Sequence, residues 1–251
     1  MPAPLAVTAL RRHLPASRLA PFLAEAGGDP DLSLALYQWN IQVGGAIQEV
    51  LGIVEVAVRH AIDEQLRVWN PTRGVEYHSK IRYTADWTTM PAAPLAGVLA
   101  EPLTQARRYA AKAAAKRNSN PHHLRCNQPI THDDIVSQLS FGVWCKMLPS
   151  DPKKQGLQQL WKHALGAAFP RVGPDAASAN VTPEQLVYSR LDRLHNLRNR
   201  VAHMEPLLHS NIPARLTDAM AVLGYISPET RDWCGGMSRV TEVNNTRPAR
   251  K

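Results

Sequence analysis

Cysteine, aromatic residues and long apolar runs are all scarce in this chain of 251 residues. Its three cysteines, Cys126, Cys145 and Cys234, form neither a Cys-x-x-Cys pair nor an even set, which argues against a disulfide framework and fits a reducing compartment. No uninterrupted apolar run reaches the roughly 18–20 residues that cross a bilayer. The N-terminal arginines follow the apolar part, the wrong order for a secretory signal. We therefore expect a soluble, cytoplasmic protein without a membrane partner.

Strand-like alternation of polar and apolar residues is missing too, and the sequence has no internal repeat. Hydrophobic residues make up 44% of the chain and charged residues 20%, which suffices to bury a core. Twenty-nine Lys and Arg against 21 Asp and Glu give a formal charge of +8. A basic surface of this kind favours anionic partners such as nucleic acid or lipid headgroups.

Apolar residues recur at helical spacing along most of the chain, so we predict an all-α fold. It is a helical bundle with additional helices and a long loop-rich insertion. Gly44 and Gly45 mark a kink or break in the most apolar helix. We expect one domain, 1–251, with this central helix at 31–66, a loop-rich and basic insertion at 70–128, a second long helix at 182–206 and a frayed tail at 242–251.

The helix at 182–206 carries an anomaly on its apolar face. Thr182, Pro183 and Gln185 give it a capping-box start, and Pro206 marks its end. At about 100° per residue Arg198 falls inside the apolar face, while Asn199 and His203 lie together at its edge. That face is formed by Val187, Leu191, Leu194, Leu197 and Val201.

A buried cation is costly without a partner, so Arg198 needs an acid, a phosphate or a water-filled cleft in front of it. A purely structural arginine, bonded to a helix terminus or to Glu55, is the alternative. Glu55 and Arg59 raise the same question on the central helix. Their i, i+4 spacing suits an internal ion pair, and the alternative is a carboxylate that supports a catalytic group.

Arginine and histidine at this spacing suit cleavage of a phosphodiester without a metal. His203 would take the proton from a ribose 2′-OH or protonate the leaving 5′-oxygen, and Arg198 would stabilise charge on phosphorus. Asn199 would orient either group, and His195 is assigned a supporting position. The Arg-x4-His spacing alone is not specific. It also occurs at Arg73/His78, Arg117/His122 and Arg190/His195, none of which combines a capped helix, an inner-face arginine and an adjacent Asn.

The stretch "LRNRVAHMEPLL" resembles the R-(x)4–6-H signature of HEPN domains in the form found in Abi-like (abortive infection) bacterial proteins. "LSLALYQWNIQVGGAIQEVLGIVEVAVRHAID", "DIVSQLSFGVWCKML" and "RDWCGGMSRV" resemble that family in the expected order. The resemblance implies an all-α HEPN fold and a metal-independent endoribonuclease in phage defence or toxin-like growth arrest. It also implies a homodimer whose two motifs face each other across a composite RNA cleft. Among RNAs, tRNA is one candidate partner.

Arg198, Asn199 and His203 are the positions that match the motif. Glu55 and Arg59 lie in "EVAVRHAI", a family-like stretch, in which His60 stands where the family usually has Asn. Some members have a second histidine where this chain has Met204, so the proton-transfer partner stays open. The alternative function is a catalytically silent HEPN-like RNA-binding or interaction module, such as an antitoxin partner. A helical DNA-binding regulator would need a helix-turn-helix, which the sequence does not show.

Basic residues also gather on one predicted helix of the insertion. Arg108, Lys112 and Lys116 are four apart, and Arg107 and Arg117 extend their stripe. The stripe would add sequence-independent contacts to RNA phosphates, or it is simply a solvated helix face.

No cofactor or metal is predicted. The spacing of His122, His123, Cys126, His132, Asp133 and Asp134 matches no zinc pattern. Trp39 with Asn40, and Trp144 with Phe141, are predicted to belong to the core.

Overall fold

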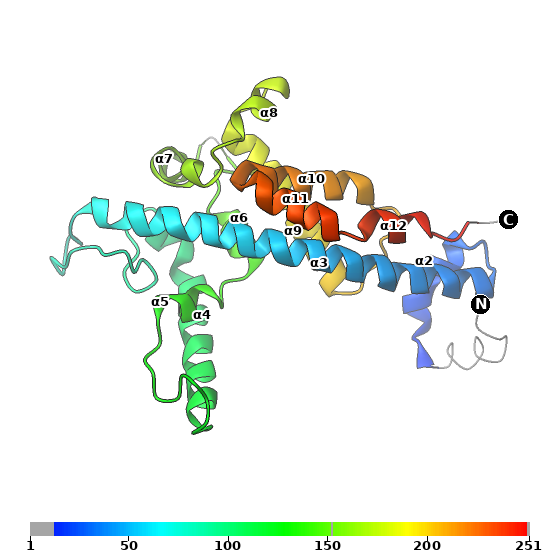
Figure 1. Cartoon of the computed structure of the whole chain (residues 1–251), viewed down its shortest axis with the longest axis horizontal. Helices are drawn as coiled ribbons and strands as arrows, with labels where there is room; N and C mark the ends of the chain where they lie inside the picture. The colour runs from blue at the N-terminus through cyan, green and yellow to red at the C-terminus, as the bar shows by residue number, and fades with distance from the viewer. Residues whose placement is uncertain (1–12, 152, 250–251) are drawn as a thin grey trace. The chain divides into compact units, whose positions relative to one another are not determined.

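The computed structural model describes residues 13–151 and 153–249, and its fold is all-α, as predicted (Figure 1). The described residues are 68% helical. Within the described ranges the only β-type pairing is an isolated antiparallel bridge between Val75 and Arg82. The helices are α2 (Ala16–Glu25), α3 (Pro30–Trp69), the 3-10 helix η1 (Asn70–Arg73), α4 (Leu95–Asn118), α5 (His132–Val136), α6 (Phe141–Lys146), α7 (Gln155–His163), the 3-10 helix η2 (Leu165–Ala168), α8 (Gly173–Ser178), α9 (Pro183–Ala202), α10 (Ile212–Ile226), α11 (Pro228–Met237) and α12 (Val240–Asn245).

The chain divides into two compact units. Unit 1 comprises 1–54 and 193–251, and unit 2 comprises 55–192. Helices α3 and α9 each contribute residues to both units. The single domain over 1–251 therefore stays a prediction.

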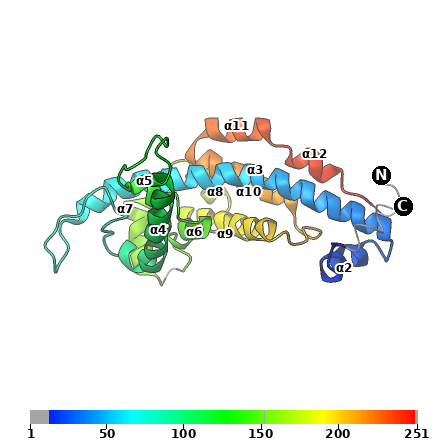
Figure 2. The same cartoon turned by 90° about the horizontal axis from the view of Figure 1, so that it is seen from below.

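Unit 1 is built on the first part of α3 and the last part of α9. Buried Ile47, Val50 and Leu51 of α3 line a small apolar cavity with Leu194 and Leu197 of α9. Helix α10 packs against α11 and α12. In Figure 2 this part of α3 lies between α9 on one side and α11 and α12 on the other. The apolar stripe of α9 is thus a core stripe, as its periodicity predicts.

Unit 2 has an aromatic core. Trp87 and Trp144, both fully buried, meet edge to face with ring centroids 6.3 Å apart. Helix α4 packs against α5 and α6, and α7 packs against η2. The loop after α3 is held by the buried Asn70, whose amide donates to the carbonyl oxygens of Thr84 (2.7 Å) and Met90 (3.1 Å). The start of the predicted loop-rich insertion is therefore held in place by side-chain hydrogen bonds.

Several boundaries differ from the prediction. Helix α3 runs over 30–69 and continues through Gly44 and Gly45, so of the predicted kink or break the break is wrong and the kink stays a prediction. The predicted tail at 242–251 is not frayed where it is described: 242–245 belong to α12, and the Arg247 guanidinium donates to the Leu208 carbonyl and to Glu25, each at 2.7 Å. Residues 250–251 lie outside the described residues.

One helical stretch in the described part of the chain, 30–73, is long and apolar enough to cross a membrane by length and composition alone. The core helix of a globular protein passes the same test. In the stretch 30–73, 44% of the most apolar window is buried inside the protein. The sequence-based criterion of an uninterrupted run missed it, because Glu49 and Glu55 interrupt the run. Localisation stays a prediction.

Candidate functional site

The helix that carries the Arg-x4-His motif begins as predicted. The Gln185 amide N–H lies 3.4 Å from the Thr182 hydroxyl, and the Gln185 side-chain oxygen accepts the Thr182 N–H at 3.2 Å. The capping box therefore forms, and it satisfies two amides at the helix start that have no partner within the helix.

The end of α9 differs from the prediction, because the helix stops at Ala202 and not at 206. Met204 adopts a left-handed backbone with φ of 54°. The Glu205 N–H donates to the Arg200 carbonyl (2.8 Å), and the Met204 N–H donates to the Val201 carbonyl (3.0 Å), which together make a Schellman motif. His203 thus lies in the turn that ends the helix.

This turn is fastened by two residues from other helices of unit 1. The buried Asn40 of α3 accepts the Leu207 N–H at 2.6 Å and donates to the Glu205 carbonyl at 3.4 Å. Arg18 of α2 donates to the carbonyl oxygens of Met204 (2.8 Å) and His203 (3.2 Å). Burial of Trp39 and Asn40 confirms their core prediction.

Arg198 lies beside a groove of about 390 Å³ in unit 1. Its side chain is half-buried, and no other described residue forms a hydrogen bond or ion pair with it. The exposed Gly45 brings no side chain to cover the groove. Among the described residues, Arg198 therefore lacks the hydrogen bond to a helix terminus or to an acid that the structural alternative requires. The groove is lined by Asn40, Ile41, Gly44, Gly45, Gln48, Arg198, Val201, Ala202, Met204, Glu205 and Leu207.

The other two motif residues, Asn199 and His203, are close to Arg198 in the sequence, but they do not line this groove. The Asn199 side-chain amide is 3.2 Å from Nε2 of His195, one helical turn earlier. The side chain of His203 is exposed. The structure therefore pairs Asn199 with His195, and it shows no contact that joins Arg198 to His203.

Glu55 and Arg59 form the internal ion pair that their spacing favours. Oε1 of Glu55 and Nη2 of Arg59 are 2.8 Å apart, and both side chains are largely buried. The pair belongs to unit 2, and its proposed support of a catalytic group stays a prediction.

The predicted basic stripe on α4 is split by the structure. Arg107 donates to the carbonyl oxygens of Thr88 and Thr89, and Arg117 donates to the Gln128 carbonyl. These two cations hold loops of unit 2. Arg108, Lys112 and Lys116 are exposed, and no described residue forms a hydrogen bond or ion pair with their side chains.

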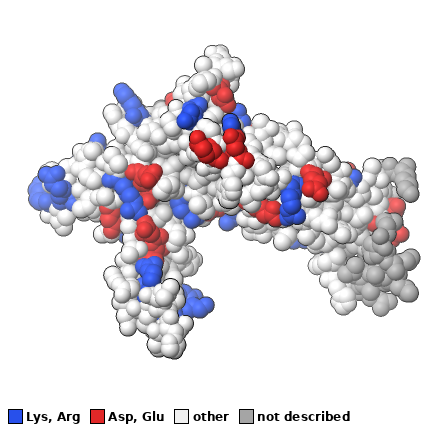
Figure 3. All heavy atoms as spheres, viewed as in Figure 1, with Lys and Arg blue, Asp and Glu red and all other residues white. Residues whose placement is uncertain are grey.

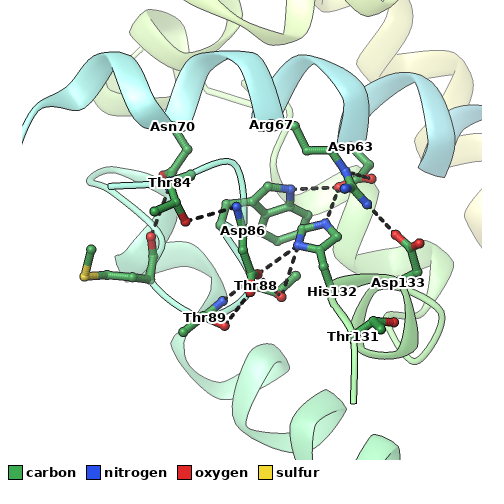
Figure 4. A network of polar contacts seen from close by, with 12 residues as sticks. Asp63, Arg67, Asn70, Thr84, Asp86, Thr88, Thr89, Thr131, His132 and Asp133 are labelled. Atoms are coloured by element: carbon green, nitrogen blue, oxygen red, sulfur yellow. Dashed lines mark hydrogen bonds and ion pairs between the residues drawn. The ribbon is translucent and has the colours of Figure 1, made fainter. Parts of the chain in front are cut away.

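Sequence reasoning missed a buried polar network in unit 2 (Figure 4). His132 stands between two carboxylates: its Nε2 is 2.8 Å from Asp63 and its Nδ1 is 2.9 Å from Asp86. Nε1 of Trp87 also donates to Asp63 at 2.8 Å. Arg67 donates to Asp63 at 2.8 Å from the outer side. The one available signal was the i, i+4 spacing of Asp63 and Arg67, because Asp86 and His132 come from distant segments.

The network shifts the ionisation of its members. Burial opposes charge on His132, but hydrogen bonds with Asp63 and Asp86 outweigh it and raise the pKa of the imidazole. Burial likewise opposes charge on both carboxylates. The pKa of Asp63 is nevertheless lowered by His132 and Arg67, and that of Asp86 by Thr88 and His132. The three groups therefore favour a buried imidazolium between two carboxylates.

The six residues considered for a metal site are not assembled as a set. Asp134 instead forms a capping box with Thr131 at the start of α5. Its two carboxylate oxygens accept hydrogen bonds from Nη1 and Nη2 of Arg125, each at 2.7 Å. Asp63, His132 and Asp133 do place ligand atoms within 4.8 Å of one another. The Arg67 guanidinium already contacts both of these carboxylates, so a permanent cation occupies the position that would attract a metal.

Comparison of the chain with protein-family models, curated proteins and solved structures finds no match.

Proposed function

We propose that the protein is a metal-independent endoribonuclease of the HEPN type that cleaves RNA through the ribose 2′-OH. The observation that carries the proposal is Arg198, a half-buried arginine beside a groove with no described partner. Holding an unpaired cation there is costly, and an anionic ligand would remove that cost. A phosphodiester matches the fork of donors that a guanidinium presents.

His203 supplies the proton transfer in this proposal. An imidazole exchanges protons near neutral pH, and its exposure at the end of α9 leaves it accessible to a bound strand. Asn199, hydrogen-bonded to His195, would orient the ribose or phosphate. The net charge of +8 favours binding of a polyanion.

The resemblance to Abi-like proteins extends the proposal to a homodimer with a composite cleft, acting in the cytoplasm in phage defence or growth arrest. A dimer fits the incomplete site of one chain, because the groove that Arg198 lines does not include His203. The partner's motif would then complete the catalytic pair.

The same incompleteness favours a second candidate, an HEPN-like module that binds RNA or a protein without cleaving. In that case Arg198 would anchor a phosphate or a carboxylate in the groove, and His203 would have no chemical role.

The deciding experiment is cleavage of total RNA in EDTA by wild type, Arg198→Ala and His203→Ala, with His122→Ala as a control for loss of an exposed loop histidine. We expect only wild type and His122→Ala to cleave and to leave 2′,3′-cyclic phosphate ends. Arg198→Ala should keep the wild-type Tm, because no described ion pair is lost. Cleavage by His203→Ala at the wild-type rate would refute the mechanism, and RNA binding without cleavage would favour the binding module.

A further inference from the structure

Unit 2 has a basic hollow that the sequence did not indicate. It measures about 310 Å³ and lies where the last turns of α3 and η1 meet the end of α7 and η2. Arg73, Lys162 and His163 line it, and none of its lining residues is acidic. Trp69, Val68 and the two alanines Ala164 and Ala167 give it an apolar wall. A hollow of this size and charge matches a ligand that joins a phosphate to a flat apolar group.

The chain leaves the hollow through a small hairpin-like loop, residues 74–83. The Glu76 N–H donates to the Ile81 carbonyl at 2.8 Å, and the Tyr83 N–H donates to the Gly74 carbonyl at 3.0 Å. The Glu76 carboxylate accepts the N–H groups of His78 (2.9 Å) and Ser79 (2.5 Å). The single acid of the loop is therefore turned toward its own backbone, and the loop has a defined shape.

The loop presents cations beside an exposed aromatic ring. Tyr77 is 77% exposed, and the Lys80 ammonium lies 4.6 Å from its ring centroid. Arg82, which pairs with Val75 in the isolated β-bridge, adds a further positive charge. Figure 3 shows Lys and Arg atoms gathered where α3 ends and this loop begins. Exposed aromatic rings and cations together make the stacking and phosphate contacts that single-stranded nucleic acids use.

We propose that this α3-end surface, formed by Arg73, Tyr77, Lys80, Arg82, Lys162 and His163, binds single-stranded RNA. The phosphates contact the cations, one base stacks on Tyr77, and a neighbouring nucleotide enters the hollow. A concave basic hollow favours a nucleotide over a flat anionic bilayer. The choice of RNA rests on the proposed function, but the surface lies in unit 2 and needs none of the cleavage chemistry of Arg198 and His203.

The test uses a fluorescein-labelled 15-nucleotide 2′-O-methyl uridine strand, which the proposed nuclease cannot cleave. Fluorescence anisotropy compares wild type with the triple variant Arg73→Gln/Lys80→Gln/Arg82→Gln and with Tyr77→Ala. We expect the triple variant to bind at least 10-fold more weakly. Its slope of log K against log salt should be shallower by about 2, since each phosphate contact contributes about 0.7 on single strands. Tyr77→Ala should weaken binding 5-fold or more with an unchanged slope.

The charge-matched control is Lys146→Gln/Lys153→Gln/Arg171→Gln, three exposed cations elsewhere in unit 2. Equal losses in the control and the test variant would overturn the proposal, since only net charge would then matter. Binding to phosphatidylserine vesicles but not to the strand would overturn it in favour of a lipid surface. If the strand binds normally while natural RNA is never cleaved, the proposed function fails and this inference stands.

Discussion

Met204 shows how a single backbone angle ends the motif helix. Residues with a Cβ pay about 1–2 kcal/mol in the left-handed region, which glycine does not. Met204→Gly should therefore raise the free energy of unfolding by about 1 kcal/mol and raise Tm by roughly 2–4 °C in a chain of this length. Differential scanning calorimetry checks this. Met204→Ala loses the same side chain but keeps the Cβ, so an equal gain there would contradict the backbone explanation.

His132 predicts a pH dependence. The pKa of His132 is raised in the folded protein. Its contribution to the free energy of unfolding is therefore full below the ordinary histidine pKa of 6.5 and is lost as pH rises through the folded pKa. The lowered folded pKa values of Asp63 and Asp86 make their contribution full above 3.8 and lost as pH falls. The network therefore stabilises most between about pH 4 and 6.5.

His132→Gln should lower the free energy of unfolding by about 3 kcal/mol near pH 5.5, since it removes the cation between Asp63 and Asp86 and leaves only Arg67 beside Asp63. The deficit should shrink as pH rises above 6.5. Urea titrations at several pH values measure it, with the exposed His122→Gln as reference. A deficit that stays constant from pH 5 to 9 would mean that folding does not shift the pKa of His132.

At the scale of elements, helix α4 carries two kinds of cation: those that hold loops and those that are free to contact RNA phosphates. Arg107 and Arg117 donate to loop carbonyls, whereas the exposed side chains of Arg108, Lys112 and Lys116 have no hydrogen bond or ion pair with a described residue. Arg108→Gln/Lys112→Gln/Lys116→Gln should weaken RNA binding several-fold at low salt without sequence preference. Anisotropy with two unrelated strands tests this. Unchanged affinity would show that α4 is a solvated face.

Helix positions were predictable because apolar periodicity and caps are local properties. The central helix, the capping box at Thr182 and the pair of Glu55 with Arg59 all follow from spacing. The end of α9 did not, since Pro206 suggested a longer helix while the left-handed Met204 ends it four residues earlier. Gly44 and Gly45 suggested a break that α3 does not have, because helix packing outweighs the low propensity of glycine.

At the scale of the whole molecule, the proposed composite site predicts a dimer. Light scattering should give about twice the 27.8 kDa of one chain at concentrations where RNA is cleaved. Cleavage per chain should fall on dilution below the dimer dissociation constant. A monomer that cleaves at the full rate would rule out a site shared between two chains.

The sequence by itself determined the all-α class, most helix positions and the presence of Arg198 on an apolar stripe, since each depends on residues within a few turns of one another. Tertiary structure alone decided that a groove opens beside Arg198, because Gly44 and Gly45 come from a helix some 150 residues earlier. It also brought Asp63, Asp86 and His132 into one network from three separate segments. Contacts between distant segments depend on how helices pack, and that information is not contained in local spacing.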